Sequence, residues 1–68
     1  MSNKTRGKIK WFNKLKGYGF IEQASGDDLF VHANSIQGDA DYVNDGQAVE
    51  FVVSRGQKGL QADNVVLL

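Results

Sequence analysis

Apolar and polar residues alternate in five separate stretches of this chain, and such alternation is typical of β-strands with one buried and one exposed face. Residues 34–47 show no period and are rich in Gly, Asp and Asn, so they are expected to form a loop with one helical turn near 34–36. Residues 1–5 are polar and are expected to fray. The pattern predicts an all-β fold whose strands cover approximately residues 6–13, 17–23, 28–33, 48–54 and 60–66.

The second predicted strand carries its large aromatic residues on alternate positions. Tyr18 and Phe20 share a row with Lys16 and Glu22, and charges at both ends of this row indicate a side that faces solvent. The opposite row holds small or apolar residues, namely Gly17, Gly19 and Ile21. The sequence therefore predicts that the two rings are exposed.

The third predicted strand repeats this arrangement. Leu29, Val31 and Ala33 form an apolar row that is expected to face a core, which leaves Phe30 and His32 on the outside. Gly and Asp residues in the segment 24–27 are turn formers, so the second and third strands are expected to pair as a hairpin. Two neighbouring strands then each present aromatic side chains to water.

The first predicted strand adds cations to the same face. Lys8, Lys10 and Phe12 occupy one row of this strand, and Ile9 and Trp11 occupy the other. By this parity Trp11 is buried beside Ile9, whereas the lysines and Phe12 lie among the exposed rings of the next two strands.

Five short strands cannot bury both faces of a flat sheet, whereas closure into a barrel removes the unpaired edges. Gly17 and Gly19 on the inward row suit a narrow, sharply coiled barrel, because side chains there would crowd their neighbours. We therefore expect a small five-stranded antiparallel Greek-key barrel of the oligonucleotide-binding type, as a single domain over residues 1–68. The predicted core residues are Ile9, Ile21, Val31, Val49, Phe51, Val53 and Val65.

The charges of the chain are unevenly distributed. The formal net charge is zero, which argues against binding of polyanions by bulk attraction. Six of the eight basic residues nevertheless lie in the first sixteen positions, where there is no acid. This separation predicts a local positive patch on or near the first strand.

Several classes of protein are disfavoured by what the sequence contains. There is no Cys, no apolar run of membrane-spanning length and no apolar core of a signal peptide, so we expect a cytoplasmic protein without disulfides. Adjacent acids at Asp27 and Asp28 are typical of a turn rather than of a metal site. His32 is the single His, and no paired acid and base or phosphate-binding loop is visible, so we expect neither catalysis nor a cofactor, metal or small-molecule substrate.

Three motifs in order carry a specific resemblance: Lys10-Trp11-Phe12-Asn13, Lys16-Gly17-Tyr18-Gly19-Phe20-Ile21 and Leu29-Phe30-Val31-His32. With these, and with Ile36-Gln37-Gly38, Asp45-Gly46-Gln47 and the closing Gln61-Ala62-Asp63-Asn64-Val65, the chain resembles the bacterial cold-shock proteins over nearly its whole length. The resemblance implies a cold-shock domain that binds single-stranded RNA or DNA across its first three strands. It also implies action as an RNA chaperone or transcription antiterminator, and we expect a monomer.

The candidate nucleic-acid-binding residues come from both arguments. The exposed rows select Lys8, Lys10, Phe12, Lys16, Tyr18, Phe20, Phe30 and His32. The resemblance adds Trp11, which it places on the rim of the binding face against its parity, and also Tyr42 and Gln61. Lys58, in the turn before the last strand, is a further cation that could contact phosphate.

The chain departs from the family pattern at three places. Ala33 stands where the family usually has another aromatic residue, and Leu60 stands where a Pro often occurs. The long loop is also shorter than is usual in the family. These departures predict a weaker binder or an altered footprint. An exposed aromatic patch also fits a protein-interaction module, which is the alternative function.

Overall fold

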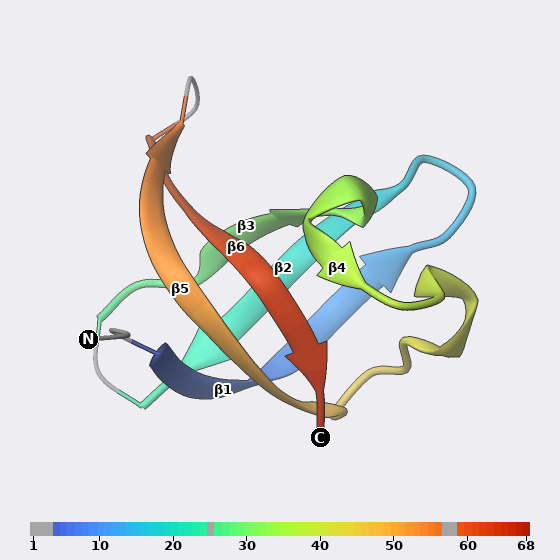
Figure 1. Ribbon diagram of the computed structural model, residues 1–68, viewed down its shortest axis with the longest axis horizontal. Coiled ribbons are helices and arrows are strands. Elements are labelled where there is room, and N and C mark those ends of the chain that lie inside the picture. The colour runs from blue at the N-terminus through green and yellow to red at the C-terminus, as the bar shows by residue number, and fades with distance from the viewer. Residues whose placement is uncertain (1–3, 25, 57–58) are drawn as a thin grey trace.

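The computed structural model describes residues 4–24, 26–56 and 59–68 of the chain. Strands dominate this part, and two short 3₁₀ turns interrupt the long loop (Figure 1). The elements in chain order are β1 (Lys4–Asn13), β2 (Tyr18–Gln23), β3 (Leu29–His32), η1 (Ala33–Ser35), β4 (Ile36–Gln37), η2 (Ala40–Tyr42), β5 (Ala48–Gly56) and β6 (Gly59–Leu67). None of the helical segments in these described ranges is long and apolar enough to cross a membrane.

The five long strands close into a barrel. Their order is β3-β2-β1-β5-β6, and a pairing between β3 and β6 joins the two edges. The neighbours within this order are antiparallel, whereas the closing pair, in which Phe30 lies opposite Gln61, is parallel. In Figure 1 the long β5–β6 hairpin crosses the sheet made by β1, β2 and β3. The predicted five-stranded barrel is confirmed.

The structure moves several element boundaries. Lys4 and Thr5, which were expected to fray, instead pair with Val52 and Phe51 of β5. The helical turn expected near 34–36 is present as η1, and the two-residue strand β4, which adds to β6 in parallel, was not predicted. The turn η2 was also not predicted. These short elements give order to a loop that shows no period in the sequence.

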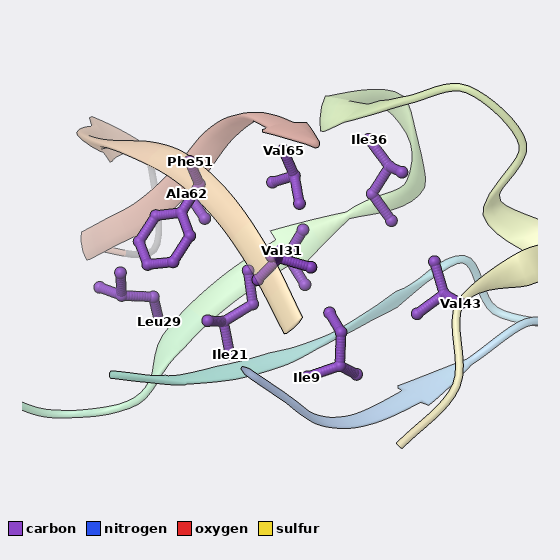
Figure 2. Packing of buried hydrophobic residues seen from close by; sticks show 10 residues of the cluster. Ile9, Ile21, Leu29, Val31, Ile36, Val43, Phe51, Ala62 and Val65 are labelled. Carbon is purple, nitrogen blue, oxygen red and sulfur yellow. The ribbon is translucent and has the colours of Figure 1, made fainter. Parts of the chain in front are cut away.

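The core lies inside the barrel and is formed by residues from five strands, β4 and the loop (Figure 2). Six of the seven predicted core residues are buried, and Leu29 is buried as its row required. The prediction for Val53 is wrong, because its side chain is 37% exposed. Val52 is opposite Lys4, so Val53 lies beyond the described part of the neighbouring strand β1. The buried set is Ile9, Ile21, Leu29, Val31, Ile36, Val43, Val49, Phe51, Ala62 and Val65.

The two glycines expected on the inward row have different roles. Gly19 is buried, and a Cβ there would overlap the carbonyl oxygen of Trp11 and lie 2.7 Å from the Cα of Phe12. Gly17 lies in the turn before β2 rather than in the strand, and its φ of 76° is favoured only for glycine. Gly19 therefore permits the close approach of β1 to β2, and Gly17 permits the turn between them.

A carboxylate joins three elements at one end of the barrel. Asp63 of β6 accepts hydrogen bonds from Ser54 Oγ of β5, from Gln61 Nε2 at 3.2 Å and from Ser35 Oγ of η1 at 3.2 Å. The hydrogen bond from Ser54 is the main reason that the pKa of Asp63 lies below its ordinary value. Burial opposes this effect, and the hydrogen bonds from Gln61 and Ser35 lower the pKa by smaller contributions.

Substitution of Gly19 by Ala should test the close approach of β1 and β2. We expect Gly19→Ala to lower the free energy of unfolding by about 1–3 kcal/mol or more, because the added methyl group meets backbone atoms that cannot rotate away. Urea unfolding measures the change. Glu22→Ala, at an exposed position of the same strand, should change stability by less than about 0.5 kcal/mol. Equal stability of the two variants would contradict this account.

Removal of the Asp63 carboxylate should have a pH-dependent effect on stability. Because the folded state lowers this pKa, the stabilisation is present above the ordinary Asp pKa of about 3.9 and is lost as the pH falls through the folded value. At neutral pH we expect Asp63→Ala to cost about 1–3 kcal/mol, a difference that shrinks below about pH 4. Urea unfolding at several pH values checks this. Asp45→Ala removes the same charge from an exposed turn, and a similar pH dependence there would overturn the assignment.

Candidate nucleic-acid interface

A bulge in β1 determines where its aromatic side chains lie. Ile9 is opposite Ile21, but Trp11 is opposite Phe20, so the partner strand has no residue that matches Lys10. Directly opposed residues of an antiparallel pair share a face. The bulge therefore moves Trp11 to the outer face, where it is 38% exposed, as the resemblance implied and against its parity.

The same bulge reverses the position of Phe12. The sequence pattern placed this ring on the lysine row and predicted partial exposure; the row is wrong, whereas the ring is partly exposed as expected. Phe12 lies opposite the buried Gly19, is half-buried and packs against the core cluster. A bulge depends on how strongly the strand must curve, which strict alternation along the sequence does not reveal.

Four rings from three strands form a continuous cluster on the outer face. The ring centroids of Trp11 and Phe20 are 5.4 Å apart, and those of Trp11 and Tyr18 are 5.7 Å apart. Phe30 lies 5.9 Å from both Phe20 and Tyr18, edge-on to the first and stacked with the second at an interplanar angle of 27°. The registers of β1, β2 and β3 thus bring these four predicted site residues together.

His32 ends β3 beside this cluster. It is opposite Tyr18 in the register, and its side chain is exposed. The Nδ1 atom accepts a hydrogen bond from the backbone N–H of Asn34 at 3.1 Å, which caps η1. In the neutral ring the proton therefore lies on Nε2, which leaves a donor for a ligand.

The lysines of the first strand differ in their surroundings. Lys10 Nζ is 2.7 Å from Asp28 Oδ2, and the hydrogen bond and charge of Asp28 raise the pKa of Lys10. Lys4 and Arg6 both pair with Glu50.

Two other predicted cations, Lys8 and Lys16, have no acidic partner in the described part of the chain. Within residues 4–24, 26–56 and 59–68, Lys8 and Lys16 form no side-chain ion pair and both are exposed. They are therefore the cations of the first strand and turn most available to a phosphate. Lys58 lies outside the described residues.

Tyr42 lies in η2, away from the four-ring cluster in the chain and without a ring contact in the described structure. Its side chain is 71% exposed. The neighbouring turn is tied to η2 because Lys14 Nζ donates to the carbonyl oxygen of Asp41 at 2.8 Å. Gln61, by contrast, lies directly beside the cluster, because β6 pairs with β3 at Phe30.

A pocket of about 530 Å³ opens at the edge of the ring cluster. It includes Leu60 and Asp28, which the sequence reasoning did not place in the site. Asp28 could have been found from its position on the outer row with Phe30 and from its charge, which is opposite to that of Lys10. Leu60 could have been found because it departs from the family pattern. The pocket is lined by Phe20, Gln23, Gly26, Asp27, Asp28, Leu29, Phe30 and Leu60.

The outer face combines aromatic rings with charged side chains; Trp11 is exposed, and Tyr18, Phe20 and Phe30 are half-buried. Aromatic rings on a protein surface offer flat apolar faces on which bases can stack, and neighbouring cations attract phosphates. In the described part of the chain no three His, Asp or Glu side chains gather as ligands for a metal ion.

Comparison with known proteins gives a consistent result. A model of the 'Cold-shock' DNA-binding domain matches residues 5–68. The major cold shock protein CspA of Pseudomonas aeruginosa is 59% identical over 66 residues, which cover 96% of each chain. Cold shock protein CapB of Pseudomonas syringae is 52% identical over 69 aligned positions that cover both chains fully. Cold shock protein CspB of Bacillus caldolyticus is 53% identical over 64 residues, or 93% of this chain and 97% of that one.

A solved structure also has the same fold. The Drosophila Unr CSD456 structure matches with a TM-score of 0.83 at 24% identity, over 98% of this chain and 27% of that chain. The family model and the full-length relatives show that the chain belongs to the cold-shock domain family of nucleic-acid-binding proteins.

Proposed function

We propose that this chain binds single-stranded RNA and DNA with low sequence specificity by stacking bases on its outer face. The observation that carries the proposal is the cluster formed by Trp11, Tyr18, Phe20 and Phe30, with ring centroids 5.4–5.9 Å apart on three adjacent strands. Stacking on such rings tolerates any sequence, because every base has a π face. Duplexes bind poorly, because their bases are already stacked on one another.

The surrounding side chains have distinct proposed roles. Lys8 and Lys16 attract the phosphates, and Lys10, held by Asp28, lies beside the rings. His32 and Gln61 contact base edges. Phe12 supports the sheet from the inner side, while Tyr42 and Lys58 extend the path of a longer strand.

A preference for unpaired strands supports a role as an RNA chaperone or transcription antiterminator. A protein that binds only the open form of an RNA hairpin shifts the equilibrium toward that form without ATP. We place this activity in the cytoplasm and assign it to the monomer. The lysines beside the rings favour a nucleic acid over a protein partner, since an apolar protein surface would gain nothing from them.

Loss of a ring should weaken binding without unfolding the protein. We expect Phe20→Ala and Phe30→Ala each to weaken binding of a short pyrimidine-rich DNA by about 1–3 kcal/mol. Quenching of Trp11 fluorescence on titration measures the affinity, and the matching duplex should quench far less. Leu68→Ala, which removes an exposed apolar side chain outside the cluster, serves as the control. Unchanged affinity in a folded ring variant would refute the proposal.

Salt should weaken binding in proportion to the number of phosphate contacts. If Lys8, Lys10, Lys16 and Lys58 each contact one phosphate, the slope of log K against log salt should be near −3, at about −0.7 per contact. We expect Lys8→Gln and Lys16→Gln each to reduce this slope by about 0.7. Lys4→Gln, at a position paired with Glu50, should leave it unchanged. A salt-independent affinity would contradict the phosphate contacts.

A further inference from the structure

The Leu15 turn, residues 14–17, connects β1 to β2 and presents an apolar side chain that the core does not use. Leu15 is 98% exposed, more than any other large apolar residue in the described part of the chain. Lys14 and Lys16 stand on either side of it, both are exposed, and the turn contains no acid. The side chain of Asn13 accepts from the N–H of Lys16 at 2.9 Å, and Lys14 is bonded to a backbone carbonyl of η2. These bonds hold an apolar side chain between two positive charges.

The pocket of about 530 Å³ beside the ring cluster, the acidic pocket, has the complementary character. Its lining includes Leu29 and Leu60, and Leu60 is 54% exposed. Asp27 and Asp28 also line it, and both are exposed. Within residues 4–24, 26–56 and 59–68, Asp27 forms no ion pair, whereas Asp28 has one. Pockets of this volume bury whole small molecules, so one Leu side chain fits within it.

The Leu15 turn and the acidic pocket lie at opposite ends of β2, so they do not meet within one molecule. The turn precedes Tyr18, the first residue of β2, whereas the pocket is lined by Gln23, the last residue, and by the connection that follows (Figure 1). A strand of this length, six residues, spans about 20 Å. A contact between the two features therefore joins two copies head to tail, and such a contact extends into open chains rather than a twofold dimer.

We propose that the chain associates with itself weakly, by insertion of Leu15 of one copy into the acidic pocket of another. In this contact the apolar side chain leaves water, while Lys14 and Lys16 approach the carboxylates of Asp27 and Asp28. One turn in one pocket buries much less surface than a stable interface needs, so the association is reversible and is weakened by salt.

The same contact covers part of the ring cluster. Phe20 and Phe30 line the acidic pocket, and both belong to the cluster proposed to stack bases. A copy seated in the pocket therefore excludes bases from these two rings, and a bound nucleic acid excludes the copy. The self-association is independent of the proposed function, whereas this competition rests on it. The second copy is thus a partner that nucleic acid displaces.

Dilution of the ¹⁵N-labelled whole chain, followed by NMR chemical shifts, measures the association and maps both of its surfaces. We expect a dissociation constant on the order of 1 mM at low salt, with the largest shifts at residues 14–17, 26–30 and 60. Leu15→Ser should weaken the association by about tenfold or more, because it removes the buried apolar side chain. Leu68→Ser, at another exposed apolar position, is the matched control and should associate as the wild type does.

A charge exchange tests whether the turn and the pocket meet each other. Lys14→Glu and Asp27→Lys should each weaken the association, because like charges then face one another in the contact. An equal mixture of the two variants should recover most of it, since the altered turn meets the altered pocket and the unchanged turn meets the unchanged pocket. A mixture that associates no better than either variant alone would overturn the assignment of the two surfaces.

The competition is tested with oligo(dT) of about eight nucleotides, within the roughly 4–16 nucleotides that one such fold covers. An equal amount of this oligonucleotide should remove the shifts that depend on protein concentration. Leu15→Ser should bind it with wild-type affinity in dilute solution, where Trp11 fluorescence reports binding to the single copy.

The outcomes separate the inference from the proposed function. A wild-type spectrum that does not change with concentration, or an association that Leu15→Ser leaves intact, would overturn the inference and leave the proposed function standing. Association that persists with the oligonucleotide bound would overturn the competition. A folded wild type that does not bind the oligonucleotide would refute the proposed function and the competition with it, and the dilution series alone would then decide the self-association.

Discussion

One extra residue in β1, at Lys10, reverses the side of the strand on which each later residue lies. Before the bulge Ile9 enters the core; after it Trp11 joins the outer rings and Phe12 covers the core beside Gly19. A strand that curves around a barrel this narrow needs such an irregularity, because bulges increase bending and twist. The curvature that closes the fold is thus the same feature that completes the ring cluster.

Strand parity predicted the parts of the fold that depend only on near neighbours in the chain. The rows of β2 and β3 were correct for Tyr18, Phe20 and Phe30, because alternation within a regular strand is local. Parity placed Trp11 and Phe12 on the wrong sides of β1, because it does not include the bulge at Lys10. The position of a bulge depends on how the whole barrel curves. Val53 lies on the predicted inward row, yet its side chain is exposed, because alternation along a strand does not show which of its residues the neighbouring elements cover.

The polar contacts of the site could not be predicted from the sequence pattern, because they join residues that are far apart in the chain. The bond from Lys10 to Asp28 joins residues 18 positions apart, and that from Ser35 to Asp63 joins residues 28 positions apart. The uneven distribution of charge correctly predicted that the cations gather on the first strand. It did not predict which of these cations are neutralised by acids. Acids from β5 and from the turn before β3 pair with Lys4, Arg6 and Lys10. The surface that carries unpaired positive charge is therefore smaller than the run of basic residues in the sequence suggests.

Under the proposed function, the charges also limit how a strand of nucleic acid can lie on this face. Asp28 and Asp63 flank the rings on the β3 and β6 side. Within the described ranges, Lys8 and Lys16 are the exposed cations of β1 and the following turn whose ammonium groups form neither an ion pair nor a hydrogen bond, whereas Lys14 donates to a backbone carbonyl. A phosphodiester backbone is repelled by carboxylates and attracted by unpaired lysines. Because Lys10 pairs with Asp28, the repulsion comes mainly from Asp63. Bases stacked on the four rings would therefore direct their edges toward β6 and their phosphates toward β1. This orientation places base edges, rather than phosphates, beside the ordered side chains of Gln61 and His32.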